Sequence, residues 1–322
     1  MIKVSHLTKS YGTTKAVDDI SFTMQPGHIY GLLGPNGAGK TTTMNMMTGY
    51  LGTSSGTVTI DGYDIFKDQK NAKKRIGYLP EVPPLYIEMT VLEYLVFVIE
   101  LKGIPRKERE EELKRVVKTA SLEDMENRLI RNLSKGYRQR VGFAAAIVGN
   151  PKFIILDEPT VGLDPRQLNE FRQQLEEMKK DHIILLSSHI LSEVNEVCDY
   201  IFIISQGKLI LSEKTSELSR RFESRRHLNI QGIGDGEAAR MALLDIPVIS
   251  EVKVIQEAGK KEANLEVEFV GNQDIRPRVS ELLMELHFAI VEMKEEGQSL
   301  EDVFLQLTDN FELKKCKEVD EE

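Results

Sequence analysis

Residues 34–42 read GPNGAGKTT, in which three glycines lead into a lysine and two threonines. The stretch matches the pattern GxxxxGK[ST]. The apolar run HIYGLLG (28–34) before it is typical of a buried strand, and TTMNMMTGYL (42–51) is typical of a helix. A phosphate-binding loop requires this strand-to-helix placement, whereas a chance Gly-rich turn would lack both it and the fixed Gly-Lys-Thr.

The residue types in this stretch indicate its chemistry. Glycines allow backbone amides to close around phosphate oxygens, and the start of a helix adds its positive end. Lys40 is expected to reach the β- and γ-phosphates, and Thr41 offers a hydroxyl to Mg²⁺. We therefore predict a nucleoside-triphosphate site. Its loop residues are Gly34, Pro35, Asn36, Gly37, Ala38, Gly39, Lys40, Thr41 and Thr42.

A second apolar run, KFIILDE (152–158), ends in two carboxylates. On its own such a strand end is weak evidence, because a solvated turn would read the same way. Together with a phosphate-binding loop it is strong evidence. Asp157 is then placed to hold the Mg²⁺ shell, and Glu158 to polarise a water aimed at the γ-phosphate.

Short β-branched runs alternate with helical patterns over the first two thirds of the chain. This alternation predicts an α/β fold of the P-loop NTPase type, with a mainly parallel sheet covered by helices. We expect this domain to span residues 1–218. The runs VLEYLVFVIEL (91–101) and PRKEREEELKRVVKTA (105–120) predict a helical insert within it at about 85–150.

The chain offers no sign of a membrane span or a signal peptide. No apolar run approaches the roughly 18 residues that a spanning helix needs, and the start MIKVSHLTKSYG lacks an apolar signal core. The sequence therefore predicts a cytoplasmic protein.

Beyond residue 218 the pattern changes. SRRFESRR (219–226) reads as a solvated linker, with a contact to anionic lipid as the alternative. Residues 227–310 give strand, helix, strand, strand, helix and strand, then a last helix at SLEDVFLQLT (299–308). This order predicts a small ferredoxin-like α+β domain, followed by an acidic tail at 311–322. From His227 onward 10 Lys and Arg stand against 22 Asp and Glu, so we expect no nucleic-acid binding.

Three further motifs follow the phosphate-binding loop: LSKGYRQR (133–140), VGLDP (161–165) and LLSSHIL (185–191). In this order and spacing, residues 1–218 resemble the ATP-binding cassette (ABC) family. The family's signature LSGGQ corresponds to Ser134 and Gly136, its D-loop to Asp164 and its switch histidine to His189. The signature is degenerate, because lysine at 135 and tyrosine at 137 replace the usual glycine and glutamine.

The resemblance implies an ATPase that works as a head-to-tail dimer, either of two copies or with a related cassette subunit. Each ATP would lie between the phosphate-binding loop of one chain and the signature of the other, with His189 on the γ-phosphate and Asp164 across the interface. Tyr11 of SHLTKSYG (5–12) would stack on adenine, unless it is simply a hairpin tyrosine.

The segment IGYLPEVPPLY (76–86) combines three prolines with a single carboxylate, Glu81. The resemblance implies that this segment is the Q-loop, with Glu81 in the place of the usual glutamine. Glu81 could offer an oxygen to Mg²⁺ and a charge near the γ-phosphate. The prolines suit a stiff strut toward helices that face a membrane partner. The alternative is a rigid surface loop with a solvated carboxylate.

The ending SLEDVFLQLT and the segment GYLPE (77–81) resemble those of single-cassette subunits of bacterial exporters. This implies an ATP-hydrolysing subunit, peripheral at the inner face of the cell membrane, that powers a separate transmembrane permease. The main alternative is a soluble ATPase acting on nucleic acid or ribosomes, but such proteins usually carry two cassettes or a long coiled coil. A regulatory binding module is disfavoured because both Lys40 and Glu158 are present.

Overall fold

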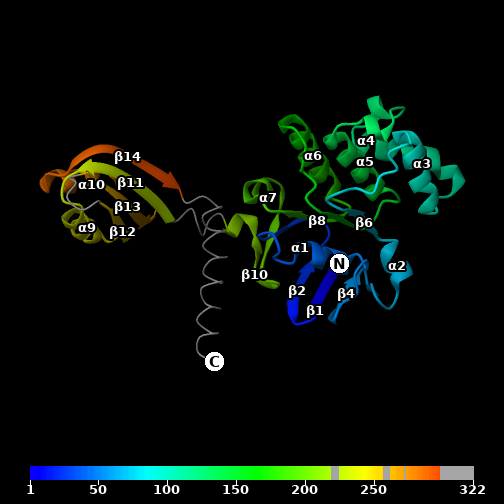
Figure 1. Ribbon diagram of the computed structural model, residues 1–322, viewed down its shortest axis with the longest axis horizontal. Coiled ribbons are helices and arrows are strands. Elements are labelled where there is room, and N and C mark those ends of the chain that lie inside the picture. Colours follow the sequence, from blue (N-terminus) through cyan, green and yellow to red (C-terminus); the bar gives the residue numbers. More distant parts are fainter. Residues whose placement is uncertain (219–224, 257–261, 272, 298–322) are drawn as a thin grey trace. The chain divides into compact units, whose positions relative to one another are not determined.

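The computed structural model describes residues 1–218, 225–256, 262–271 and 273–297 (Figure 1). The chain divides into two compact units, Met1–Thr215 and Ser216–Glu322. The predicted helix at 299–308 and the acidic tail at 311–322 lie outside the described residues. Among the residues described, no helix has the length and apolar character needed to cross a bilayer.

A six-stranded sheet in the order β10-β9-β3-β8-β7-β6 forms the centre of the first unit. β10 pairs antiparallel with β9, and the other neighbours pair in parallel. The central strands are buried on both faces, which explains why they read as continuous apolar runs. The α/β prediction is confirmed. The strands are β3 (Ile29–Leu33), β6 (Ile76–Leu79), β7 (Phe153–Leu156), β8 (Ile183–Ser188), β9 (Tyr200–Ser205) and β10 (Lys208–Lys214).

A smaller antiparallel sheet, in the order β2-β1-β4-β5, shares a hydrophobic core with the six-stranded sheet. Helix α1 (Lys40–Met47) contributes Met44, Met46 and Met47 to this core. This packing fixes α1 against the sheets on its buried side. The strands are β1 (Ile2–Tyr11), β2 (Thr14–Met24), β4 (Ser55–Ile60) and β5 (Tyr63–Asp64).

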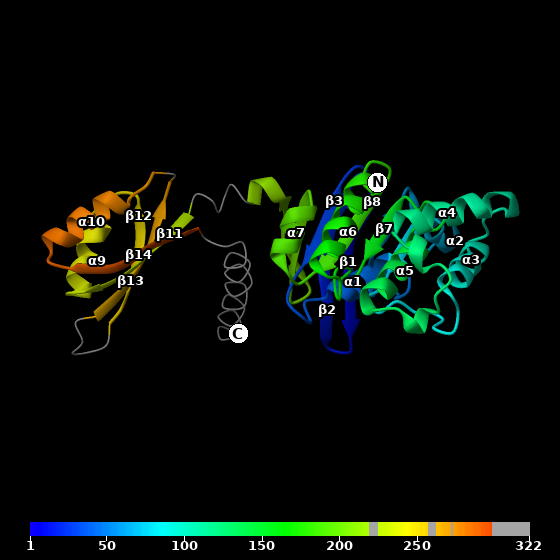
Figure 2. The ribbon, with the colours of Figure 1, turned by 90° about the horizontal axis from the view of Figure 1, so that it is seen from above.

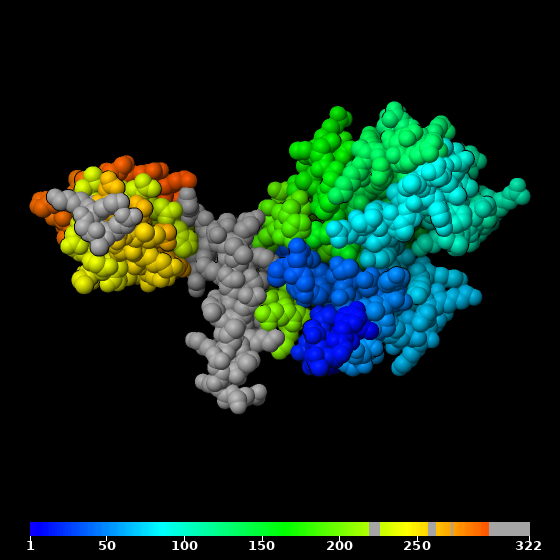
Figure 3. Space-filling model, in the orientation of Figure 1, coloured from blue at the N-terminus to red at the C-terminus, as the bar shows by residue number. Residues whose placement is uncertain are grey.

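The predicted helical insert consists of α3 (Val91–Leu101), α4 (Arg109–Thr119) and α5 (Lys135–Ile147). These helices pack against one another, and α5 also contacts β6. Figures 1 and 3 show them as a cyan-to-green mass beside the blue N-terminal strands. The remaining helices of this unit with described bounds are α2 (Gln69–Lys73), α6 (Pro165–Met178), α7 (Leu191–Val197), η1 (Arg106–Glu108), η2 (Glu123–Met125) and η3 (Ile130–Asn132).

The second unit has the element order β-α-β-β-α-β and an antiparallel sheet in the order β12-β13-β11-β14. Both helices cover the same face of this sheet and bury an apolar core with it (Figure 2). This is the arrangement of a ferredoxin-like α+β fold. The elements are β11 (Arg225–Ile233), α9 (Gly236–Leu244), β12 (Ile249–Ile255), β13 (Glu262–Val270), α10 (Arg276–Glu285) and β14 (Ala289–Gly297).

Strand β11 begins at Arg225, so the last two residues of the predicted linker 219–226 belong to the sheet. The reason is visible at Arg226, which forms an ion pair with Glu295 of β14. Its guanidinium also lies 5.4 Å from the ring centroid of Phe269. These partners accommodate a charged residue that the sequence pattern assigned to solvent.

Candidate active site

The phosphate-binding loop, residues 34–42, connects β3 to α1 and is shaped by its glycines. Gly37 and Gly39 have φ angles of 81° and 106°, in the region that favours glycine. A Cβ on Gly39 would lie 2.5 Å from the carbonyl oxygen of Ala16 in β2. Position 39 therefore needs glycine for both conformation and space. The loop brings bare backbone amides to the start of α1, where an anion binds well.

Lys40, the first residue of α1, folds back over this loop. Its Nζ donates to the carbonyl oxygen of Gly34 at 2.7 Å, and the residue is only 7% exposed. Burial lowers the pKa of Lys40, while the nearby carboxylates Glu158, Asp157 and Glu81 act in the opposite direction. The loop thus holds a buried cation facing three carboxylates that come from two other segments.

Asp157 and Glu158 follow the end of β7 and share one partner, Ser187 of β8. The Ser187 hydroxyl donates to Asp157 Oδ1 at 2.5 Å and accepts from the Glu158 amide at 2.9 Å. The parallel register, which pairs Leu156 with Leu186, brings these residues together. Glu158 has a φ of 48°, a conformation that costs a non-glycine residue about 1–3 kcal/mol. Ser187 therefore fixes both carboxylate residues at the strand ends.

His189 lies beside Glu158, just beyond β8. Its Nδ1 is 3.0 Å from Glu158 Oε2, and its side chain is 51% exposed whereas that of Glu158 is 12% exposed. Both side chains line the phosphate-loop cavity, which has a volume of about 290 Å³. This cavity gathers the predicted loop, base and switch histidine in one place. Its lining residues are Ala16, Pro35, Asn36, Gly37, Ala38, Gly39, Lys40, Thr41, Thr42, Glu81, Glu158, Val161 and His189.

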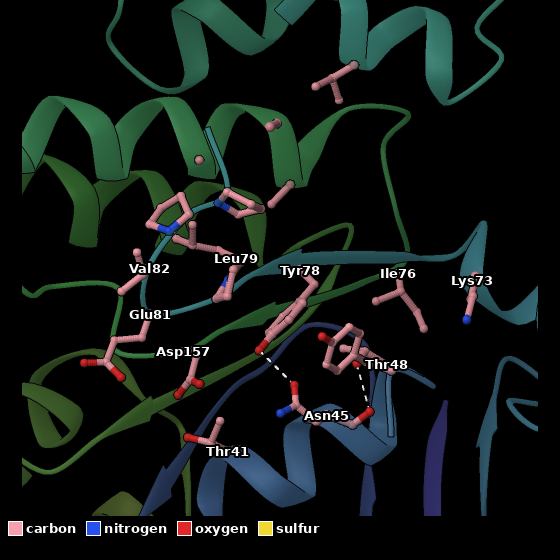
Figure 4. Close-up of a pocket in the computed structure, with 18 of the residues that line it drawn as sticks. Thr41, Asn45, Thr48, Lys73, Ile76, Tyr78, Leu79, Glu81, Val82 and Asp157 are labelled. Atoms are coloured by element: carbon pink, nitrogen blue, oxygen red, sulfur yellow. Dashed lines mark hydrogen bonds between the residues drawn. The ribbon is translucent and has the colours of Figure 1, made fainter. Parts of the chain in front are cut away.

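A larger hollow of about 860 Å³, here called the sheet–helix groove, lies between the sheet and the helical insert (Figure 4). Thr41, Glu81 and Asp157 lie together at one end of it. Thr41 and Glu81 also line the phosphate-loop cavity, so the two spaces adjoin at these residues. The groove is lined by Thr41, Asn45, Thr48, Tyr50, Lys73, Ile76, Tyr78, Leu79, Pro80, Glu81, Val82, Pro83, Pro84, Tyr94, Val98, Lys102, Gly142, Ala145, Ala146 and Asp157.

Tyr78 is one of the polar side chains that line the groove. Its hydroxyl donates to Asn45 Oδ1 at 3.2 Å (Figure 4). Burial, together with the charge of Asp157, raises the pKa of Tyr78 to about 12. The phenol therefore stays neutral and ties β6 to α1 at physiological pH.

The predicted signature and D-loop residues lie elsewhere. Ser134 caps α5, and its hydroxyl accepts from the Tyr137 amide at 3.3 Å. Asp164 caps α6, and its carboxylate accepts from the Gln167 amide at 2.8 Å. Neither residue, nor Gly136, lines the phosphate-loop cavity of the same chain. A single chain therefore does not bring the two sets of predicted site residues together.

Tyr11 lies at the end of β1 and is 54% exposed. The Nζ of Lys9 is 5.3 Å from its ring centroid. Tyr11 is not among the residues that line the phosphate-loop cavity. Its stacking on adenine stays a prediction.

Known proteins are similar to this chain in sequence and in fold. The family model for ABC transporters matches residues 17–161. The bacitracin transport ATP-binding protein BcrA of Bacillus licheniformis is 34% identical over 309 residues, which cover 95% of this chain and 97% of that protein. The chain belongs to the ABC transporter ATP-binding proteins. As an ATP-binding cassette of this family, it is an ATPase.

Two further matches extend this result. The linearmycin resistance ATP-binding protein LnrL of Bacillus subtilis (strain 168) is 30% identical, over 96% of this chain and 98% of that protein. A solved ATP-binding subunit of an ABC transporter has a TM-score of 0.64 at 30% identity, covering 69% of this chain and 93% of that one. A dimeric post-hydrolysis cassette with bound ADP and Pi has a TM-score of 0.61 at 25% identity, over 67% and 99%. The predicted cassette fold of this ABC ATPase is confirmed.

Sequence reasoning missed Ser187, Ala16 and Val161 in this ABC ATPase. Ser187 lies within the run LLSSHIL (185–191), but the run alone does not mark it as a site residue, because its role depends on which strand lies next to β7. The signal that could identify Ser187 is a second strand, parallel to β7, that ends in a serine where β7 ends in two carboxylate residues. Ala16 in β2 and Val161 in the segment after β7 line the cavity because these two segments lie next to it. An apolar side chain carries no sequence pattern that would mark it as part of a nucleotide site.

Proposed function

We propose that two ATP-binding subunits close head to tail around two ATP molecules. Each ATP lies between the phosphate-binding loop of one chain and the start of α5 of the other. The observation that carries this proposal is the position of Ser134 and Gly136 outside the cavity that Lys40 lines. A dimer would supply these groups from the second chain, and the similar cassette solved with ADP and Pi is also a dimer.

In this dimer Glu158 acts as the general base for the attacking water. Its carboxylate lies at the cavity wall, and its Oε2 is oriented by His189 at 3.0 Å. His189 is half exposed toward the cavity and contacts the γ-phosphate. Lys40 lies against the loop and neutralises charge on the β- and γ-phosphates. The bond between the β- and γ-phosphates is then hydrolysed, giving ADP and phosphate.

Thr41 and Asp157 fit a Mg²⁺ ion, with Glu81 as a third oxygen donor. Asp157 is 2% exposed and has one oxygen held by Ser187, so its carboxylate is oriented in advance. Among the described residues there is no group of three or more His, Cys, Asp or Glu that could hold a metal. Thr41 and Asp157 would hold the ion together with phosphate oxygens of the bound nucleotide, as is usual for Mg²⁺. When bound, it offsets the charge that develops on the phosphates.

The sheet–helix groove is the proposed docking site for a helix of a separate transmembrane permease. Val82 on its rim is 79% exposed and Tyr50 is 84% exposed, so an apolar occupant would bury them. The groove adjoins the phosphate-loop cavity at Glu81. Gly142 of α5 makes room for Pro83, since a Cβ there would lie 2.8 Å from Pro83 Cβ. Nucleotide state thus reaches α5 through a stiff contact.

The named relatives favour an exporter at the cytoplasmic face of the membrane. One acts in bacitracin transport and another in linearmycin resistance. By analogy, this subunit drives export of a compound of this kind. The docking proposal is tested by Val82→Asp, which should abolish co-purification with a co-expressed transmembrane permease, whereas Met241→Asp on exposed α9 should not. Equal recovery of the permease by both variants would exclude the groove.

The dimer is tested with Glu158→Gln, which removes the base and keeps the shape of the side chain. We expect hydrolysis to fall by about 10²–10⁴-fold while ATP binding is retained. Light scattering should then detect a dimer with ATP and a monomer with ADP. Glu111→Gln on the exposed face of α4 is the matched control and should hydrolyse ATP normally. A monomer at saturating ATP would contradict the proposal.

A further inference from the structure

Helix α7 begins just after His189, and Glu193 in its first turn has a partner far from it in the sequence. A glutamate at this third position of a helix commonly turns back to accept from the amide of the residue that precedes the helix. In α7 that amide, of Ile190, donates instead to the Ser188 hydroxyl at 3.0 Å. The Glu193 carboxylate accepts from the Thr160 hydroxyl at 2.7 Å. This bond links α7 to the segment that follows β7.

No cation competes for the Glu193 carboxylate. Among the residues that the structure describes, Glu193 forms no ion pair, and Thr160 is its one side-chain partner. Arg172 of α6 lines the same small cavity, of about 10 Å³, but pairs with Glu196 one turn further along α7. A hydroxyl that donates to an ionised carboxylate, beside the buried ring of Phe171, makes a stronger bond than two neutral groups would. The contact is therefore suited to hold the two segments together.

Thr160 lies two residues after Glu158, the proposed base. Glu158 has a φ of 48°, which is unfavourable for a residue other than glycine, so it needs support from its surroundings. On its N-terminal side, Ser187 accepts from its amide at 2.9 Å. On its C-terminal side, Glu193 holds Thr160. Both supports come from β8 and the helix after it, between which lies His189, whose Nδ1 is 3.0 Å from Glu158 Oε2.

We propose that Glu193 is a positioning residue for ATP hydrolysis. Through Thr160 it holds the residues after β7 in place beside His189, so that the Glu158 carboxylate points at the attacking water. This inference rests on the function proposed above, in which Glu158 is the base. Glu193 does not line the phosphate-loop cavity, so it acts through Thr160 and not on the nucleotide.

The consequence falls on turnover and not on nucleotide binding. The phosphates are bound by Lys40 and the loop before it, which belong to a different part of the chain. The base, by contrast, must be placed accurately, because a displacement of about 1 Å can lower a rate by about a hundredfold. Loss of one support of Glu158 should therefore lower kcat and leave the KM for ATP unchanged.

The test measures steady-state hydrolysis and ATP affinity in the full-length chain. Thr160→Val keeps the shape of the side chain and removes the hydrogen-bond donor. Its kcat should fall about tenfold, while its KM for ATP and its ATP affinity stay those of the parent. Thr160→Ser keeps the hydroxyl and should retain most of the parent's kcat.

Glu193→Ala tests the same bond from its other partner, and should lower kcat to the same extent as Thr160→Val. The variant that carries both changes should be no slower than either single variant, because each change removes the same bond. Glu196→Ala is the matched control on the same helix. It loses the ion pair with Arg172 and should keep the parent's kcat.

Four results would overturn the inference: the parent's kcat in Thr160→Val, a rise in KM in place of the fall in kcat, a Thr160→Ser variant as slow as Thr160→Val, or losses that multiply in the double variant. Glu158→Gln, measured alongside, separates these results from a failure of the proposed base. If its hydrolysis stays low, the base assignment stands whatever the result for Glu193. If it hydrolyses ATP at the parent's rate, Glu158 is not the base and the inference fails with it.

Discussion

Two helices of this ABC ATPase, α1 and α5, each begin with a lysine, but their N-termini have different surroundings. At α1 the glycine loop and the buried Lys40 form a cavity within one chain, with Glu158 and His189 on its wall. At α5 the first turn lies at the surface, and Ser134 only caps its own helix. The first end is finished, in that its cavity is complete within one chain, whereas the second lines no part of that cavity. In the dimer proposed above, nucleotide binding would belong to the monomer and closure to the dimer.

Lys40→Ala and Ser134→Ala should separate these two functions with the largest effects. Lys40→Ala removes the cation of the finished site, so the ATP affinity of the monomer should fall by about tenfold to a hundredfold. Ser134→Ala should leave that affinity unchanged and abolish the ATP-dependent dimer in the Glu158→Gln background. Calorimetry measures the first quantity and light scattering the second. Equal loss of monomer affinity in both variants would remove the distinction between the two ends.

Ser187→Ala should lower hydrolysis at the finished site, although Ser187 itself is not proposed to contact the nucleotide. The change leaves the Glu158 amide unpaired and one Asp157 oxygen without its donor, at a cost of about 1–3 kcal/mol each. We expect hydrolysis to fall about tenfold or more and the melting temperature to drop. The matched control is Ser188→Ala, which loses only a bond from the Ile190 amide. Indistinguishable turnover of the two variants would show that Ser187 does not position the carboxylates.

Glu81→Gln should produce a smaller change in the finished site. Glu81 places a negative charge at the junction of the cavity and the groove, so ATP should bind poorly until Mg²⁺ offsets that charge. The amide keeps the shape and removes the charge. ATP affinity should therefore depend less on Mg²⁺ in the variant. Superimposable Mg²⁺ titrations for the two proteins would leave Glu81 without a role in metal binding.

Removal of everything after Leu218 should have the smallest effect. The two helix starts and every predicted nucleotide contact lie before this point, and Leu218 itself is 1% exposed. The shortened chain should therefore bind ATP with the affinity of the full chain, as measured by a nucleotide-dependent melting shift. A folded fragment that binds no ATP would show that the acidic second unit contributes to the site.

Much of the nucleotide site could be predicted because its residues are close together in the sequence. The phosphate-binding loop is one continuous stretch, and its strand and helix lie directly beside it. Asp157 and Glu158 could be assigned because each parallel strand ends at the same edge of the sheet. Ser187 could not, because its role depends on β8 lying beside β7 in a particular register.

The groove and the linker boundary also could not be predicted, because both depend on contacts between residues far apart in the chain. The groove takes residues from positions 41 to 157, and no short-range pattern connects them. The sequence predicts a linker that runs to residue 226, because Arg225 and Arg226 read as solvated charges. In the structure Arg226 instead has partners across the sheet, Glu295 and Phe269.

The sequence by itself determined the order of the elements, the phosphate-binding loop and the identity of the catalytic candidates, because local residue spacing controls these features. Only the tertiary structure decided that β8 lies between β3 and β7, so that Lys40, Asp157, Glu158 and His189 meet at one sheet edge. It alone also decided that the start of α5 stays outside that cavity. Both depend on strand order and helix packing, which arise from contacts between residues far apart in the chain.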